Sequence, residues 1–330
     1  MRLHEEETLF RQAVVATADQ LGIPEIFIEK DYWVTYALHS IFHAPIGEDT
    51  VFKGGTALSK CFGLIDRFSE DIDLVVKQHG GETDNQLKRK IKNVGQAVIP
   101  LLPEVEIEGV TRKMGMNRKT AHSYPKIFAG QFGQVRNVIV VEATWFGYYE
   151  PYSAYPLSSY IHDMMVEQDQ QTMIEDFGLL PFQVNVQQPI RTLCEKIMSL
   201  VRFSYSATPM DDLRMKIRHV YDLHKMLEEQ ELDSFFNSSQ FETLIRKVGQ
   251  DDMQSFRNNN EWLVRHPAEA LLFRDVEHCW DGLRATYTGD FSGLVYGELP
   301  GEQQILATLI RIKERLQEVE WNISMDGSNI

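Results

Sequence analysis

Two aspartates separated by one residue, Asp71 and Asp73, stand at the start of an apolar run that covers residues 72–76. The run has the length and β-branched content of a strand. Residues two apart in a strand point to the same side, with α-carbons about 7 Å apart. Two carboxylates placed in this way repel each other unless a divalent cation or a proton lies between them. Solvated aspartates at an exposed strand start are the alternative, which the apolar residues around them disfavour.

A glycine-rich turn, Gly54-Gly55-Thr56, precedes the aspartates and opens a segment with helical spacing. The glycines let the backbone approach a ligand closely, and Thr56 is suited to cap the helix that follows. Free amides at such a point favour a phosphate. Lys60, one helical turn further, could reach the same anion. Glycine also occurs in such turns for steric reasons alone, so the phosphate interpretation depends on the aspartates that follow.

Oxygen ligands that face a phosphate-binding turn suit Mg²⁺, with Mn²⁺ as the alternative ion. A third carboxylate, Glu142, follows the apolar run at residues 138–141, where an unpaired charge would be costly. A metal ion would explain this carboxylate, as would a buried Arg or Lys. We expect Asp71, Asp73 and Glu142 to be metal ligands.

The order of elements predicts an α+β fold. Strands are expected at residues 72–76, 105–112 and 135–145, and an aromatic, proline-containing link at 148–156. Helical spacing occurs at residues 8–20, 26–42, 57–65 and 86–101, and later at 189–203, 212–227, 267–283 and 301–320. We therefore expect a core with a mixed sheet at residues 1–155 and a mainly helical domain at 156–330.

Two sites are predicted in the helical half. Lys196 lies at the border of an apolar helix face, where it would either extend into solvent or point into a cleft. Arg218 and Asp222 are four residues apart on one helix, away from its apolar face. By spacing alone they form a surface ion pair that contributes little to stability.

Composition excludes several classes of protein. The 330 residues are 43% hydrophobic and 25% charged, as in a soluble globular protein. We find no apolar run of about 18 residues and no secretory signal, and the three cysteines are far apart, so a reducing cytoplasm is expected. The formal charge of −15 repels polyanions over most of the surface. The basic residues at 112–119 are either a local nucleic-acid contact or a solvated loop.

Taken together, these segments resemble the AbiEii-type nucleotidyltransferase toxins of abortive-infection and related toxin–antitoxin pairs. The resemblance is strongest at residues 52–60 and 67–74. It is also present at residues 28–35 and weaker at 195–202 and 218–223. His219 departs from the family, which usually has an acidic residue there.

The resemblance implies a polymerase-β-like nucleotidyltransferase core followed by a helical domain that closes the cleft. In this interpretation, the Gly54-Gly55-Thr56 turn and Lys60 hold the triphosphate of an NTP, and Asp71 and Asp73 hold Mg²⁺. Lys196 contacts phosphates, and Asp222 completes the catalytic set, so the Arg218–Asp222 face would line a cleft. The prediction that Glu142 is a metal ligand depends on the strand pattern and not on the family motif.

The reaction expected from this set is transfer of a nucleoside monophosphate from an NTP to an acceptor hydroxyl, with release of pyrophosphate. The acceptor would be the 3′ end of a tRNA or a protein, and a neighbouring gene would encode the antitoxin. Two other classes of function stay open. One is a non-catalytic NTP sensor that binds a partner protein, and the other is a metal-dependent phosphohydrolase.

Overall fold

The computed structural model describes residues 1–330 except 114, 131–134, 146–147, 256–259 and 324–330. The described chain forms two compact units. The first comprises residues 1–63 and 67–187, and the second comprises residues 64–66 and 188–330. No helix of the described residues is long and apolar enough to cross a membrane.

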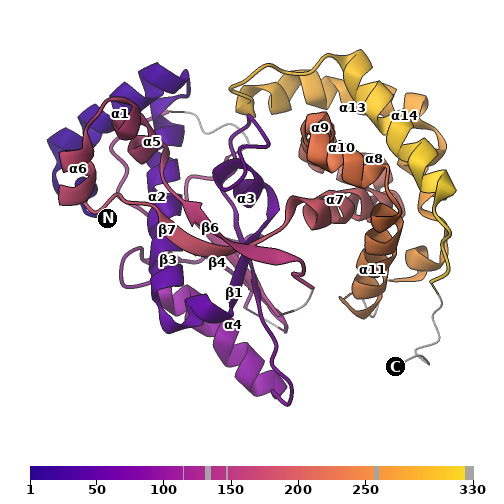
Figure 1. The fold of residues 1–330 in the computed structure, drawn as a ribbon, viewed down its shortest axis with the longest axis horizontal. Coiled ribbons are helices and arrows are strands. Elements are labelled where there is room, and N and C mark those ends of the chain that lie inside the picture. The colour runs from indigo at the N-terminus through magenta and orange to yellow at the C-terminus, as the bar shows by residue number, and fades with distance from the viewer. Residues whose placement is uncertain (114, 131–134, 146–147, 256–259, 324–330) are drawn as a thin grey trace. The chain divides into compact units, whose positions relative to one another are not determined.

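Within the described residues, the first unit contains a seven-stranded mixed sheet (Figure 1). Its strands are β1 (Thr50–Lys53), β2 (Ile72–Val76), β3 (Glu104–Val105), β4 (Asn117–His122), β5 (Ile139–Thr144), β6 (Tyr152–Leu157) and β7 (Phe182–Gln187). The strand order is β3-β4-β5-β2-β1-β7-β6. The β1–β7 and β2–β5 pairs are parallel, and the other pairs are antiparallel. The predicted mixed sheet is confirmed.

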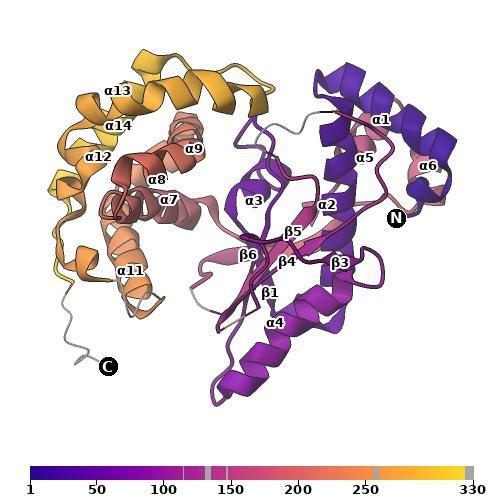
Figure 2. The same cartoon turned by 180° about the vertical axis from the view of Figure 1, so that it is seen from behind.

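The helices of the first unit are α1 (Glu7–Leu21), α2 (Glu25–His43), α3 (Gly54–Lys60), α4 (Asp84–Val98), α5 (Tyr160–Glu167) and α6 (Gln171–Asp176). Helices α2 and α4 contact each other and the sheet, as the view from behind in Figure 2 shows. Helix α4 begins with a Thr83–Gln86 capping box. A Cβ atom at Gly95 of α4 would lie 3.7 Å from Arg118 Nε. Helix α4 therefore packs on the side of β4 that carries Arg118.

Two strand predictions were wrong. The strand expected at 105–112 ends at Val105, because the chain turns back there and Thr111 donates through its amide and its hydroxyl to the Ile107 carbonyl, at 2.9 and 3.0 Å. The link expected at 148–156 contains strand β6, and β7 was not predicted. Strand β6 lies at the sheet edge and is mostly exposed, which explains its weak apolar pattern and its tolerance of Pro156.

The expected division between residues 155 and 156 falls inside β6. Strand β6 pairs with β7 over six residues, and β7 pairs with β1 at Phe52 and Val186. Both late strands therefore complete the sheet of the first unit, and the helical unit comprises the chain from Gln188 onward together with residues 64–66.

The second unit is helical within its described residues. Its α-helices are α7 (Pro189–Phe203), α8 (Pro209–Met215), α9 (Ile217–Glu228), α10 (Gln230–Phe236), α11 (Ser239–Ser255), α12 (Leu271–Arg274), α13 (Val276–Thr286) and α14 (Glu302–Glu318). Helix α7 contacts α8, α9, α10, α11 and α12. Its residues Leu193, Ile197 and Leu200 are fully buried, which confirms the apolar face expected from their spacing.

Candidate active site

Strand β2 positions the two aspartates. Asp71 directly precedes the strand, and Asp73 is its second residue; both side chains are half-buried. Ile72 and Leu74 alternate with them and are buried, as expected for a strand with one face in the core. The predicted strand is therefore confirmed.

A row of four charged residues crosses this face of the sheet. Lys53 of β1 pairs in register with Asp73 of β2, Asp73 with Glu142 of β5, and Glu142 with Lys119 of β4. Directly paired residues of neighbouring strands share one face. The row therefore places two carboxylates between two lysines, on the side of β4 opposite Arg118.

Glu142 is held on both oxygens by side chains of β4. Asn117 Nδ2 donates to Oε1 at 2.6 Å, and Lys119 Nζ donates to Oε2 at 2.9 Å. Burial alone would raise the pKa of Glu142, but the bond and charge of Lys119, the Asn117 bond and the charge of Lys53 outweigh burial and lower it. The sequence had left a metal ion and a basic residue open as partners of Glu142, and the structure provides Lys119.

Asp73 lies where negative charge is incompletely balanced. Burial, followed by the charges of Asp71 and Glu142, raises the pKa of Asp73 to about 7, although Lys53 and Lys119 act in the opposite direction. A divalent cation would relieve this repulsion, and hard carboxylate oxygens are ligands that Mg²⁺ prefers. Among the described residues, no group of three His, Cys, Asp or Glu side chains is placed to hold a metal by itself. The fit is therefore to an ion held by the two aspartates and completed by substrate phosphates.

The glycine turn lies directly against Asp73. Gly54 has φ = +83°, and a Cβ atom at this position would lie 2.5 Å from Asp73 Oδ2. A Cβ atom at Gly55 would lie 2.8 Å from the Arg67 guanidinium and 2.9 Å from Ser69 Oγ. Only glycine at residue 54 combines this backbone conformation with the present position of Asp73.

Thr56 ties the turn to the strand. Its hydroxyl donates to the Asp71 carbonyl at 2.7 Å and lies 3.0 Å from Ser69 Oγ, and its side chain is fully buried. The prediction that Thr56 caps the helix was wrong, because α3 begins at Gly54 and Lys53 is its N-cap residue. The β-type backbone of Lys53 continues β1 directly into α3, which leaves no separate capping residue between them.

Helix α2 braces the site through three consecutive buried charges. Glu29 accepts from the amides of Ile127 at 2.7 Å and Phe128 at 3.2 Å. Lys30 is fully buried and bonds to Glu70, the residue before Asp71, and also to the Arg136 carbonyl. Consecutive residues of a helix point about 100° apart, so these three side chains leave α2 in different directions. Each of them meets a different segment because α2 is covered on most sides.

The third charge, Asp31, holds the end of α3. It forms a buried ion pair with Lys60 and accepts the Tyr160 amide at 2.9 Å. The Lys60 ammonium, which was predicted to reach a phosphate, is therefore paired with Asp31 in this structure. Burial raises the pKa of Asp31, and the charge of Lys60 opposes this effect. The charges of α2 lie in a segment that resembles the family, but they were not predicted as site residues; charged residues inside an apolar helix were the available signal.

In the second unit, Lys196 of α7 and Asp222 of α9 form a buried ion pair with Nζ and Oδ2 2.7 Å apart. The side chain of Asp222 is fully buried, and that of Lys196 is 7% exposed. The exposed position expected for Asp222 from spacing alone was therefore wrong. Asp222 lies on a helix face that packs against α7, a contact that local periodicity does not reveal.

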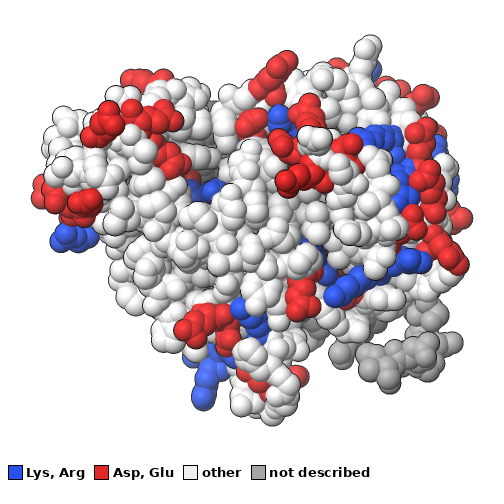
Figure 3. Space-filling model, viewed as in Figure 1, with Lys and Arg blue, Asp and Glu red and all other residues white. Residues whose placement is uncertain are grey.

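The basic segment at 112–119 does not form one surface; its residue 114 lies outside the described part. Lys113 pairs with Glu104 at 2.7 Å and Glu106 at 3.0 Å, Arg118 lies 3.7 Å from Glu104, and Lys119 pairs with Glu142. The alternation of β4 sends Arg118 and Lys119 to opposite faces. On the face shown in Figure 3, acidic side chains gather over α1 and α6.

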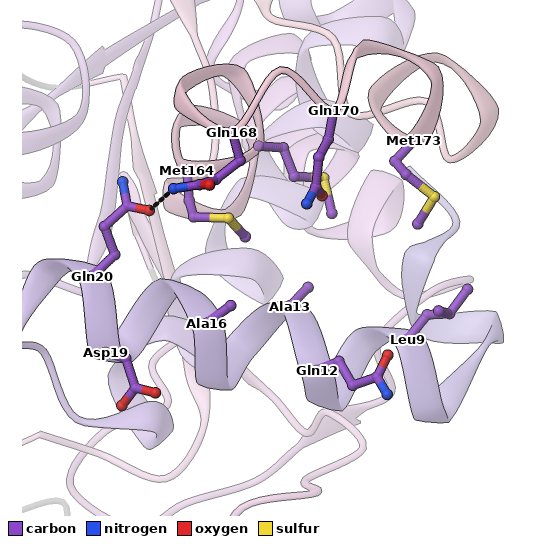
Figure 4. Close-up of a pocket in the computed structure, with 11 residues that line it drawn as sticks. Leu9, Gln12, Ala13, Ala16, Asp19, Gln20, Met164, Gln168, Gln170 and Met173 are labelled. Carbon is purple, nitrogen blue, oxygen red and sulfur yellow. Dashed lines mark hydrogen bonds between the residues drawn. The ribbon is translucent and has the colours of Figure 1, made fainter.

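A groove of about 760 Å³ lies elsewhere in the first unit, between α1 and the α5–α6 segment (Figure 4). Its lining includes Ala13, Met164 and Met173, and Gln168 donates to Gln20 at 3.2 Å across it. None of the site residues described above lines this groove, so its volume does not identify it as the catalytic centre.

Comparison with known proteins identifies one family. The family model described as "Nucleotidyl transferase AbiEii toxin, Type IV TA system" matches residues 36–317. No curated protein sequence matches the chain. Among solved structures, MenT4, a nucleotidyltransferase toxin from Mycobacterium tuberculosis H37Rv, is 18% identical with a TM-score of 0.45; the match covers 93% of this chain and 97% of that chain.

Proposed function

Because this chain belongs to the AbiEii family of nucleotidyltransferase toxins of type IV toxin–antitoxin systems, we propose that it transfers a nucleoside monophosphate from an NTP to an acceptor hydroxyl. The bond between the α-phosphorus and the bridging oxygen to the β-phosphate breaks, pyrophosphate leaves, and the α-phosphate forms a phosphodiester with the acceptor oxygen. The observation that carries the proposal is the placement of Gly54 directly against Asp73, whose carboxylate also feels the charge of Asp71. In this arrangement, a turn without side chains borders a pair of carboxylates.

In this proposal, the glycine turn binds the triphosphate and the aspartates bind the metal ion. Gly54 and Gly55 leave the backbone bare, so that amide groups can approach the triphosphate. Asp71 and Asp73 would hold Mg²⁺ together with phosphate oxygens, as the charge balance around Asp73 supports. When bound, the ion supplies positive charge to the phosphates and lowers the pKa of the acceptor hydroxyl. Thr56 and Lys30 keep the segment that carries Asp71 in place, through the Asp71 carbonyl and Glu70 respectively.

Other roles extend this proposal. Lys196 would contact phosphates, and Asp222, its buried partner, would orient its ammonium. Lys60 would assist at the triphosphate if it exchanged Asp31 for a phosphate. Glu142 would act as a third ligand or as the base, once its bond to Lys119 is released. The antitoxin that the family implies would be encoded by a neighbouring gene. The acceptor we propose is the 3′ end of a tRNA or a protein hydroxyl.

The test is transfer of label from each α-³²P-labelled NTP, with Mg²⁺, to total bacterial RNA and to total protein. The D71N/D73N double variant should lose transfer while it keeps the circular dichroism of the wild type and a melting temperature no lower than that of the wild type. D84N, which changes an exposed aspartate in the first turn of α4, is the matched control and should transfer normally. Transfer by D71N/D73N would refute the proposed mechanism. Release of labelled nucleotide or phosphate without a labelled acceptor would indicate a phosphohydrolase instead.

A further inference from the structure

Lys119 occupies the carboxylate face where the proposed metal ion would bind. Its ammonium lies 2.9 Å from Glu142 Oε2, and both side chains are between a quarter and a third exposed. Glu142 pairs in register with Asp73, whose pKa responds to Asp71, Glu142, Lys53 and Lys119. Lys119 therefore acts on the same carboxylates as an incoming cation would.

Cations of the chain already oppose much of the negative charge of this face, although negative charge still prevails at Asp73. Three carboxylates, Asp71, Asp73 and Glu142, are opposed by Lys53, Lys119 and Arg136, whose guanidinium lies 3.2 Å from Asp71 Oδ1. A divalent cation added to this set meets like charges at short range. Repulsion between like charges at such distances amounts to several kcal/mol at the effective dielectric of a protein surface, about 20. Therefore, either one of the cations of the chain moves away when the metal ion binds, or that cation weakens metal binding.

We propose that Lys119 is a resident counter-ion that competes with the divalent cation for the carboxylate face, and so sets the metal affinity of the site. The inference rests on the metal site of the proposed function. Lys119 is suited to leave because its charge ends a flexible four-carbon chain that is partly exposed. Asn117 holds the other oxygen of Glu142 at 2.6 Å, so the carboxylate keeps an anchor when the lysine departs.

The test measures Mn²⁺ affinity without nucleotide, by electron paramagnetic resonance of free Mn²⁺, on the full chain. K119M should bind Mn²⁺ about tenfold more tightly than the wild type, because one competing unit charge is gone. K119Q removes the charge but keeps a donor for Glu142, and should show the same tightening. K119R keeps the charge and should stay near the wild type. R118M changes the neighbouring residue on the opposite sheet face, which pairs with Glu104, and should also stay near the wild type.

D73N locates the measured ion, because its loss of Mn²⁺ binding assigns the signal to this face. If D73N loses binding but K119M and K119Q bind as weakly as the wild type or more weakly, Lys119 is not a competitor, although the proposed metal site stands. If D73N binds Mn²⁺ as the wild type does, the metal site of the proposed function is wrong, and the inference about Lys119 fails with it. K119Q decides the question if K119M does not fold.

Discussion

At the scale of single residues, Gly54 shows how one missing side chain shapes the site. Alanine at residue 54 must adopt φ = +83° and place its Cβ 2.5 Å from Asp73 Oδ2. We expect G54A to lower the transfer rate about 100-fold, the usual cost of displacing a catalytic group by about 1 Å. Gly81 is the matched control, with φ = +86° and nothing within 4 Å of its added Cβ. Both G81A and G54A should lose about 1 kcal/mol of stability, but G81A should keep its activity. Equal activity of the two variants would contradict this account.

Asp73 also predicts a pH dependence of stability in the metal-free protein. Its pKa is about 7 in the folded chain and about 4 in an unfolded one, so the folded state binds the proton more tightly. This contribution to stability is complete below about pH 4 and is lost as the pH rises through about 7. In EDTA, D73N should gain stability relative to the wild type between pH 5 and pH 8, by an amount on the order of 1–3 kcal/mol. Urea denaturation at several pH values measures the difference, and a pH-independent difference would refute the prediction.

The sequence predicted Asp71, Asp73 and the glycine turn because their chemistry is local: alternation along a strand and glycine before a helix. The partners of Glu142 were not predictable in this way. Asn117 and Lys119 meet Glu142 through the β4–β5 register, and the local pattern at 112–119 resembles a solvated loop. Buried pairs such as Lys30 with Glu70 join residues 40 positions apart. The periodicity within one segment does not predict which residue of the other segment will be its partner.

At the scale of elements, α2 is a scaffold for the site. Most of its residues from Ile26 to Ile41 are buried, and three of its charges reach three separate segments. Amphipathic helices were predicted well because their apolar faces repeat in the sequence. Strand β6 was missed because it is an exposed edge strand, so its alternation was hidden, and β4 and β7 were not predicted either. The helix expected at 212–227 is interrupted at Lys216, where the backbone leaves helical geometry between α8 and α9.

The bracing role of α2 predicts a large effect on stability. K30M leaves Glu70 buried without its ammonium partner, and should destabilise the first unit by about 3–5 kcal/mol. In K30M/E70Q, the residue at 70 is neutral and can still accept from the Arg136 amide at 2.9 Å, so more than half of the loss should return. K88M, on an exposed face of α4, should change stability by less than about 0.5 kcal/mol. Urea denaturation gives all three values, and a K30M variant as stable as K88M would show that α2 does not brace the site.

At the scale of the whole molecule, charge limits how an acceptor can bind. The formal charge is −15, and three of the cations at 112–119 are already paired with Glu104, Glu106 or Glu142. A polyanion would gain little from the overall field and would have to bind through a few local contacts.

This charge distribution makes the salt dependence of RNA binding a decisive measurement. A protein that neutralises many phosphates shows a steep fall of log K with log salt, about −0.9 per phosphate contact on duplex DNA and about −0.7 on single strands. We expect this chain to bind tRNA with a slope no steeper than about −3, because the formal charge is −15 and three of the cations at 112–119 are paired with acidic residues. Fluorescence anisotropy with labelled tRNA between 50 and 200 mM salt gives the slope, with an unrelated single-stranded RNA of equal length as the control. A steep slope with both RNAs would reveal an extended basic surface and contradict the charge argument. Binding of tRNA alone, with a shallow slope, would favour recognition of its shape and 3′ end over general attraction to phosphates.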